Sequence, residues 1–360
     1  MRPKDPFIGR QLVDGQFEVL QKIGSGGMGS VYKASQPAVN RMVAIKILHP
    51  KLANRKDLAS RFRREARAMS QLTHPNTVKV FSYGELDEDG SLYIVMEMLE
   101  GRNLNQAIRK DGRMPVGKAV SLLVQVCNAL QEAHELGIVH RDLKPENIFL
   151  CTQGELHDVP KVLDFGLAKV TEQQMQPGSL ILTQEGMVFG TPEFMSPEQA
   201  QGRTLDARSD IYSLAVILYE ALTGKLPFVS RTPMEFIQKH VSEPIIPLGE
   251  RVPGLEFPPG LAEVVAKALA KKPAQRYQSA SEFAGALLPY QAGPGTPAPP
   301  SLVSPASVAS VARVQAGALA SAPQAQSQRT RVPVLVAVGL VCLVLGGILT
   351  VLFLHFVSKR

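Results

Sequence analysis

Residues 140–147 decide how the rest of this chain is interpreted, and they read His-Arg-Asp-Leu-Lys-Pro-Glu-Asn. This stretch is mostly polar and charged, whereas the residues at 138–139 and 148–150 are all apolar. Short apolar runs bounded by polar residues are typical of buried strands. We therefore expect residues 140–147 to form a loop held between two short strands.

Three side chains of this loop can supply the chemistry of phosphoryl transfer. Asp142 can accept the proton of a hydroxyl group, Lys144 can face a phosphate, and the amide of Asn147 can hold Mg²⁺. With this spacing the loop resembles the catalytic loop of the eukaryotic-like Ser/Thr protein kinases of bacteria. The resemblance covers residues 17–288 and implies an α+β fold of two lobes, one small and β-rich, the other larger and helical.

A glycine-rich segment lies near the start of that region. Residues 17–23 alternate as a strand does, and the glycines at 24–29 permit a tight hairpin whose main chain can approach phosphates. A dinucleotide-binding motif would need a helix to begin at the third glycine, but residues 31–33 continue a strand. By resemblance, ATP would be bound by Ile23, Gly24, Ser25, Gly26, Gly27, Met28, Gly29, Val31, Ala44, Lys46, Met96, Glu97, Leu99 and Phe149.

An apolar strand over residues 43–46 ends on Lys46, and the resemblance makes this lysine a ligand of the ATP α- and β-phosphates. Residues 55–72 repeat apolar positions at helical spacing, with Glu65 beside the apolar stripe. A carboxylate at that border needs a charged partner, and Lys46 is the candidate. The alternatives are an isolated surface lysine and a solvated glutamate.

The resemblance gives the next strand, residues 92–99, a role in binding adenine. Met96 would guard the back of the adenine pocket, and the main chain of Glu97 and Leu99 would form the hinge. An ordinary core strand is compatible with the same residues. Val31, Ala44 and Phe149 would sandwich the adenine.

Asp164 follows the loop after a strand hairpin and by resemblance forms the second half of a metal site. It would bind Mg²⁺, or Mn²⁺, together with Asn147.

His140 and Phe165 are expected to be packing residues that, by resemblance, join the lobes together with Met69 and Val80. A helix at 115–136 precedes the loop; Cys127 and His134 on it are expected to pack or to face solvent.

A long polar span follows at residues 169–189. A segment of this length without regular structure in a compact domain is usually functional. It resembles an activation loop on which Thr183 would be phosphorylated and clamped by Arg141. Glu185 supplies either a fixed negative charge or a solvated side chain. By resemblance, the Thr191 hydroxyl bridges Asp142 and Lys144.

Three later residues are expected to hold the large lobe together. Asp210 would cap the apolar helix that it begins and, by resemblance, anchor the main chain of residues 140–147. The resemblance also implies a buried salt bridge between Glu198 and Arg276.

The composition fits this architecture. The chain has 360 residues and a formal charge of +7 that is dispersed, apart from four arginines at 61–67 that we assign to a solvated helix face. We therefore expect no nucleic-acid partner. The three cysteines lack a paired spacing, which argues against disulfides and a zinc site.

The C-terminal part has a different composition. After an N-terminal arm (1–16) and the kinase domain (17–288), a disordered Pro/Ala/Ser-rich linker is expected at 289–331. Residues 332–357 are apolar and flanked by basic residues, and at about 1.5 Å per residue they exceed the hydrocarbon core, which is roughly 30 Å thick. A buried core helix is the alternative. The prediction is a single-pass anchor in the inner membrane with a tail at 358–360.

Two functions remain open. The first is an active membrane-anchored Ser/Thr protein kinase with ATP and protein Ser/Thr hydroxyls as substrates. In that case pairing of two copies in the membrane would favour trans-autophosphorylation of the activation loop. The second is a membrane-tethered pseudokinase or scaffold, which predicts loss of Lys46, Asp142, Asn147 or Asp164; all four are present.

Overall fold

The computed structural model describes residues 5–26, 29–49, 56–87, 89–165 and 191–291. All of them belong to a compact unit of residues 1–297, and a second unit comprises residues 298–360. Within the described part of the chain, no helix is long and apolar enough to cross a membrane. The expected span at 332–357 and the expected sites Gly27, Met28 and Thr183 lie outside the described residues.

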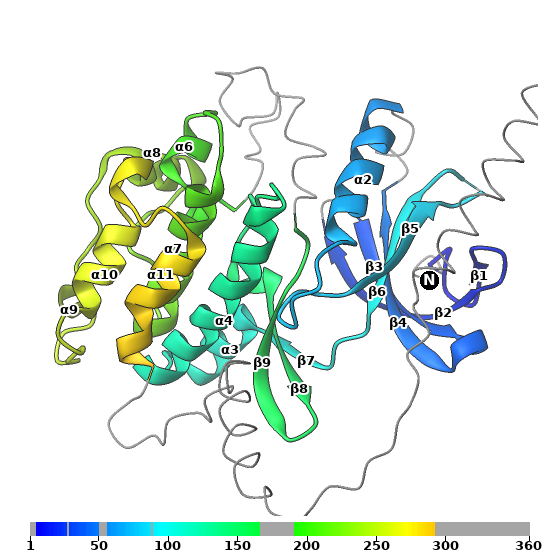
Figure 1. Cartoon of the computed structure of the whole chain (residues 1–360), viewed down its shortest axis with the longest axis horizontal. Coiled ribbons are helices and arrows are strands. Elements are labelled where there is room, and N and C mark those ends of the chain that lie inside the picture. Colours follow the sequence, from blue (N-terminus) through cyan, green and yellow to red (C-terminus); the bar gives the residue numbers. More distant parts are fainter. Residues whose placement is uncertain (1–4, 27–28, 50–55, 88, 166–190, 292–360) are drawn as a thin grey trace, which may run out of the picture. The chain divides into compact units, whose positions relative to one another are not determined.

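The N-terminal part is an antiparallel six-stranded sheet with the strand order β1-β2-β3-β4-β6-β5 (Figure 1). The short strand β1 shows that part of the expected N-terminal arm extends this sheet. The strands are β1 (Gln11–Leu12), β2 (Phe17–Gly26), β3 (Gly29–Gln36), β4 (Arg41–Leu48), β5 (Val80–Glu85) and β6 (Leu92–Glu97).

The alternation of side chains along β4 divides the strand between two faces. Val43, Ile45 and Ile47 are buried in a cluster with side chains of β1, β2 and β3. Successive strand residues point to opposite faces, so Ala44 and Lys46 lie on the other face. That second face is the one available to a ligand.

One helix, α2 (Lys56–Met69), lies beside this sheet (Figure 1). Phe62 and Ala66 on its apolar stripe are completely buried, whereas Arg63, Arg64 and Arg67 are exposed. The helix therefore has the amphipathic character expected from its spacing.

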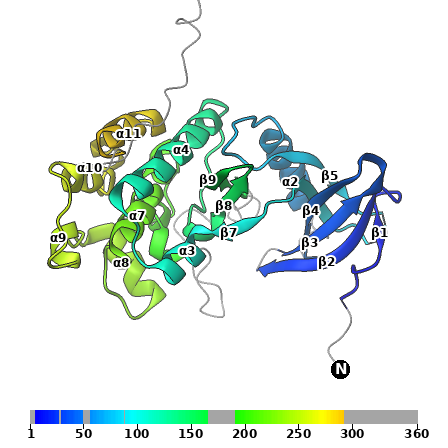
Figure 2. The ribbon, with the colours of Figure 1, turned by 90° about the horizontal axis from the view of Figure 1, so that it is seen from below.

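The remaining elements form the helical part and a three-stranded sheet of order β7-β8-β9, which lies between the large sheet and the helices (Figures 1 and 2). Its strands are β7 (Gly101–Asn103), β8 (Ile148–Gln153) and β9 (Leu156–Val162). The α-helices are α3 (Leu104–Asp111), α4 (Val116–Glu135), α6 (Pro197–Ala200), α7 (Ala207–Thr223), α8 (Pro233–Ser242), α9 (Leu248–Arg251), α10 (Leu261–Ala268) and α11 (Ala280–Leu287). Short 3-10 turns occur at Pro37–Val39, Pro145–Asn147, Pro192–Phe194, Pro273–Gln275 and Leu288–Tyr290.

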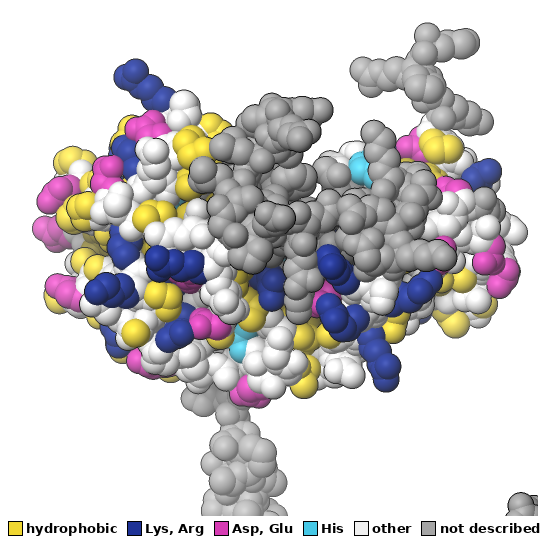
Figure 3. Space-filling model, turned by 90° about the horizontal axis from the view of Figure 1, so that it is seen from above, with side chains coloured by type: hydrophobic (Ala, Val, Ile, Leu, Met, Phe, Trp, Pro, Cys, Tyr) yellow, Lys and Arg dark blue, Asp and Glu magenta, His cyan; other side chains and the backbone are white. Residues whose placement is uncertain are grey.

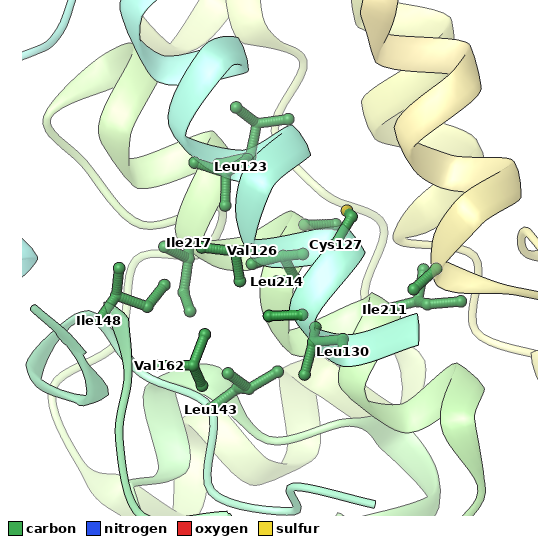
Figure 4. Close-up of a cluster of buried hydrophobic side chains, with 14 of the residues drawn as sticks. Leu123, Val126, Cys127, Leu130, Leu143, Ile148, Val162, Ile211, Leu214 and Ile217 are labelled. Atoms are coloured by element: carbon green, nitrogen blue, oxygen red, sulfur yellow. The ribbon is translucent and has the colours of Figure 1, made fainter. Parts of the chain in front are cut away.

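Helices α4 and α7 form the centre of the helical part. Figure 4 shows Leu123, Val126 and Leu130 of α4 beside Leu214 and Ile217 of α7. All five side chains are fully buried, and the cluster extends to residues of β8 and β9. This core holds residues 140–147 on a rigid support.

The expected strand at 138–139 does not form. Gly137 ends the preceding helix with a positive φ of 72°, and Ile138 N–H still donates to Ala133 O. Immediately after Val139, the main-chain N–H groups of His140 and Arg141 donate to the side chain of Asp210. Only the strand after the loop, β8, forms as expected.

Two element boundaries also differ from expectation. Helix α7 begins three residues before Asp210, and its cap is Asp206, whose side chain accepts from Arg208 N–H. Asp210 therefore lies inside the first turn and does not cap the helix. Strand β6 ends at Glu97, so the expected strand to residue 99 is two residues too long.

Candidate functional site

The strand register brings the expected ATP-binding residues of the sheet together. Val31 lies opposite Lys46 in the β3–β4 pair, and Ala44 lies opposite Met96 in the β4–β6 pair. Residues directly opposite each other point to the same face of a sheet. Because Ala44 and Lys46 are two apart, all four side chains share the face that is turned away from the cluster of Val43.

The described glycines of the β2–β3 hairpin differ in what they contact. A Cβ on Gly29 would lie 2.2 Å from Ile47 O, so this glycine is required where β3 passes β4. A Cβ on Gly26 would have no described atom within 4 Å, and one on Gly24 would meet only Val31. Packing against β4 therefore explains why residue 29 is a glycine. Packing does not explain Gly24 and Gly26, and their lack of a side chain would let a ligand approach the main chain closely.

Lys46 contacts Asp164 across 118 residues of sequence, and its Nζ donates to Oδ2 at 2.7 Å. Glu65 is buried on α2, 3.6 Å from Arg64 Nε. The ion pair that Lys46 forms among the described residues is with Asp164, and no pair with Glu65 is seen there. Asp164 reaches Lys46 from a sharp turn with φ of 57°. The catalytic role expected of Glu65 stays a prediction.

The charge of Asp164 is stabilised by its surroundings. Burial alone would raise the pKa of its carboxyl, but the ammonium of Lys46 lowers it by charge and by a hydrogen bond, with help from His140 and Lys144. The net pKa of Asp164 lies below its ordinary value, so the carboxylate is ionised at neutral pH. An ionised carboxylate is the oxygen ligand that Mg²⁺ requires.

Residues 142–147 form a compact hydrogen-bonded group. Lys144 Nζ donates to Asp142 Oδ2 at 2.8 Å and to Thr191 Oγ1 at 3.2 Å. Asn147 Nδ2 donates to Asp142 O at 2.7 Å. The structure thus brings Asp142, Lys144, Asn147 and Thr191 together, with Lys144 rather than the Thr191 hydroxyl as the bridging group.

The side chain of Asp210 holds the main chain just before this group, at His140 and Arg141. Its Oδ2 accepts from His140 N–H at 2.8 Å, and its Oδ1 accepts from Arg141 N–H at 3.0 Å. Arg141 needs this support because its φ is 69°, an uncommon conformation for a residue other than glycine. Burial would raise the pKa of Asp210, but its hydrogen bond and charge interaction with His134 lower it, and the net pKa lies below its ordinary value.

His140 links the loop to the strand that carries Asp164. Its Nε2 donates to Leu163 O at 2.8 Å, so its Nδ1 is free to accept from Asp142 N–H at 3.3 Å. The ring lies 4.9 Å from that of Phe165, and both residues are completely buried. Phe165 and Met69 lie in one core cluster, against which Val80 packs, as expected for the column that joins the lobes.

The other expected binding residues lie around this group. Ile23 is exposed on β2, Ser25 lies 3.4 Å from Ser30 Oγ, and Phe149 on β8 and Leu99 are partly buried. Glu97 ends β6, and its N–H donates to Lys79 O at 2.9 Å. Nothing in these positions conflicts with the expected hinge, and their contact with adenine stays a prediction.

Sequence reasoning missed two residues that support the loop. His134, expected to pack or to face solvent, lies 2.8 Å from Asp210 through Nε2. Gln199 donates from Nε2 to Arg141 O at 2.5 Å and forms a capping box with Ser196. The Ser-x-x-Gln spacing of such a box was the signal that could have identified Gln199.

Asn147 and Asp164 suit a magnesium site. Mg²⁺ keeps several waters and is held by one or two protein oxygens plus substrate phosphates. Leu163 N–H donates to Asn147 O at 2.9 Å, so the two candidate ligands lie on segments that are bonded to each other. Among the described residues no group of three His, Cys, Asp or Glu side chains could hold a metal.

On the face seen from above, Lys and Arg side chains lie scattered among acidic and hydrophobic ones, on both sides of the residues that are not described (Figure 3). The positive charge is therefore spread over this face. This distribution matches the dispersed basic residues of the sequence, and the absence of a nucleic-acid partner stays a prediction.

Comparison with known proteins identifies relatives for most of the chain. Residues 17–285 match the family described as protein kinase domain. The chain is 41% identical over 283 residues to serine/threonine-protein kinase pkn3 of Myxococcus xanthus. The aligned region covers 79% of this chain and 51% of the relative. It is 36% identical over 334 residues to serine/threonine-protein kinase PknA of Mycobacterium tuberculosis, which covers 91% of this chain and 74% of that protein.

The crystal structure of the Mycobacterium tuberculosis PknI kinase domain has a similar fold, with a TM-score of 0.58 and 28% identity. The match covers 79% of this chain and 98% of that domain. By contrast, the chain spans only 51% of pkn3 and 35% of pkn2 from the same organism. The shared part is therefore the domain that contains the site.

Proposed function

The chain belongs to the protein kinase family, and from this premise we propose that it is a Ser/Thr protein kinase. It transfers the γ-phosphate of ATP to Ser or Thr hydroxyls of proteins. The observation that carries the proposal is the convergence of Lys46, Asp164, Asn147 and Asp142 through direct hydrogen bonds or adjoining segments. These side chains come from three segments of the sequence, at residues 46, 142–147 and 164, and match the parts of a phosphoryl-transfer site.

Each side chain has a distinct task in this reaction. The substrate hydroxyl oxygen attacks the γ-phosphorus while the bond to the β–γ bridging oxygen breaks, and ADP leaves. Asp142 orients the hydroxyl and takes its proton, and Lys144 neutralises charge on the transferring group. Lys46 holds the α- and β-phosphates, exchanging its contact with Asp164 for them. When bound, Mg²⁺ or Mn²⁺ would neutralise charge on the β- and γ-phosphates, with Asp164 and Asn147 as its protein ligands.

We further propose that residues 332–357 anchor the kinase in the inner membrane of a bacterial cell, with the catalytic domain in the cytoplasm, where ATP is found. The support comes from the sequence, which over this range has no Lys, Arg, Asp or Glu and is apolar apart from Thr350 and His355. Confinement to a membrane raises the encounter rate between copies. Trans-autophosphorylation at Thr183 would then add a charge of about −1.5 to −2, for which Arg141 is the proposed partner.

The test is transfer of ³²P from Mg-[γ-³²P]ATP to a generic basic protein by the full chain in detergent micelles, with Asp142→Asn as the inactive comparison. Phosphopeptide mapping of the same sample reports any phosphate between residues 170 and 189. The competing function, a membrane-tethered pseudokinase or scaffold, is favoured if wild type, Asp142→Asn and a Thr183→Glu variant are equally inert.

A further inference from the structure

A buried lysine outside the expected site connects the two parts of the fold. Lys161 lies on β9 and is only 7% exposed. Its Nζ donates to Oε1 of Glu97, at the end of β6, at 2.7 Å. A lysine is almost never buried without a partner, because an isolated ammonium in the interior loses its hydration. The ion pair with Glu97, together with a longer contact of 3.5 Å from Lys161 Nζ to Thr77 O, joins these two strand ends.

Both partners are held by their own main-chain contacts. Glu97 Oε1 also accepts from Lys79 N–H at 2.8 Å, and Glu97 N–H donates to Lys79 O at 2.9 Å. On the other side, Val162 N–H donates to Asn76 O at 2.7 Å, and Val78 N–H donates to Val162 O at 3.0 Å. The segment that leads into β5 is thus bonded to the ends of both β6 and β9.

The pair adjoins the expected nucleotide site at both of its ends. Glu97 begins the segment expected to bind adenine, and Lys161 lies three residues before Asp164, the expected metal ligand. Leu163, between them, is bonded to His140 and Asn147. A shift at the pair would therefore change the separation between the adenine subsite and the metal subsite.

We propose that Lys161 and Glu97 are a positioning pair that sets this separation, so that one nucleotide can engage the hinge and Asp164 at the same time. The inference rests on the proposed function and names a determinant of nucleotide binding within it. Neither side chain needs to touch the nucleotide. Misplacement of reacting groups by about 1 Å can cost on the order of a hundredfold in rate, so a small shift is sufficient.

The test compares a ligand that spans both subsites with one that occupies a single subsite. Mg-ATP reaches from the hinge to Asp164, whereas adenosine reaches only the hinge. Dissociation constants for both are measured by competition with a fluorescent ATP analogue, and KM for ATP by phosphate transfer. For Lys161→Met we expect KM and the Mg-ATP dissociation constant to rise about tenfold, with the adenosine constant changed less than about twofold.

Two further variants keep the test informative. Lys161→Met/Glu97→Gln removes both charges, so it avoids an unpaired buried carboxylate while still lacking the pair. It should fold better than the single variant and keep the same selective loss of ATP. Lys118→Met is the matched control. Lys118, on α4, pairs at 2.6 Å with Asp158, which lies on β9 like Lys161, but the side chain of Lys118 is 43% exposed. We expect it to leave both constants unchanged.

An equal loss of ATP and adenosine in the double variant would reduce the pair to a structural support, and unchanged constants would refute any role. A gain of activity would also contradict the inference, since it would make the pair a restraint. If wild type neither binds Mg-ATP nor transfers phosphate, the proposed function fails and the inference fails with it. If wild type does both and the variants match it, only the inference is lost.

Discussion

Arg276 and Glu198 form a bidentate ion pair in the interior of the helical part. Arg276 Nη1 donates to Glu198 Oε1 at 2.7 Å, and Nη2 donates to Oε2 at 2.8 Å. Arg276 is 2% exposed and Glu198 is 5% exposed. Burial would raise the pKa of Glu198, but the guanidinium lowers it, and the net pKa lies below its ordinary value. The pair ties α6, next to residues 192–194, to the segment before α11.

Arg276→Met should destabilise the fold strongly, because Glu198 would remain buried without its partner. Breaking one side of a buried ion pair typically costs about 3 to 5 kcal/mol. The matched control is Lys267→Met, which removes an exposed pair with Glu282 at 3.3 Å and should cost less than about 1 kcal/mol. Urea denaturation measures both. Equal free energies of unfolding for the two variants would show that the buried pair is not a major support.

Asp210→Asn should reduce kcat, because an amide cannot accept from both His140 N–H and Arg141 N–H as the carboxylate does. We expect kcat to fall about 10- to 100-fold while KM for ATP changes little, since the loop moves but the nucleotide face does not. Asp206→Asn is the control, because asparagine is an equally good helix cap and the side chain of Asp206 is 49% exposed. A similar kcat for the two variants would argue against the anchoring role.

The two glycines of the hairpin should respond differently to alanine. Gly29→Ala places a Cβ 2.2 Å from Ile47 O, so β3 or β4 must shift, at a cost of about 1 to 3 kcal/mol. Gly26→Ala meets no described atom and should leave the thermal midpoint unchanged while raising KM for ATP. Thermal denaturation and steady-state kinetics separate the effects. A stable Gly29→Ala variant would contradict the packing explanation.

The sequence predicted the parts of the fold in which local pattern and burial agree. The alternation of residues 43–46 and the amphipathic spacing around Glu65 correctly predicted β4 and α2. Residues 142, 147 and 164 were identified because their order along the chain is itself a signal. The buried Glu198–Arg276 pair was predicted in the same way, by resemblance.

Other features could not be read from the sequence because they depend on contacts between distant segments. The apolar residues at 138–139 satisfy a strand pattern, but Ile138 N–H still bonds to the preceding helix and the N–H groups of His140 and Arg141 bond to the carboxylate of Asp210. The contact of Lys46 with Asp164 comes through a turn at 164 with a positive φ, 118 residues away in the sequence. Lys161 looks like any strand lysine until its partner on β6 is known.

His240 makes the stability of the fold depend on pH. It is completely buried, accepts through Nδ1 from Tyr212 OH at 2.9 Å and donates through Nε2 to Glu193 O at 3.0 Å, so it is neutral. Burial, with a smaller contribution from the charge of nearby Lys271, lowers the pKa of His240 to about 3, although the carbonyls of Glu193 and Pro192 partly oppose this.

Below its ordinary pKa of about 6.5, the unfolded chain binds a proton at this histidine that the folded chain does not. The free energy of unfolding should therefore fall as pH falls from 6.5, by up to about 1.4 kcal/mol per pH unit from this residue. His240→Gln removes the titrating group and should flatten the dependence, although it also lowers stability overall. Urea denaturation between pH 5 and 6.5 measures the two slopes. Burial raises the pKa of Glu220 to about 7, so this carboxyl contributes a slope of opposite sign in both proteins, and the difference between the two slopes reports His240. Parallel slopes would show that His240 is not the group responsible.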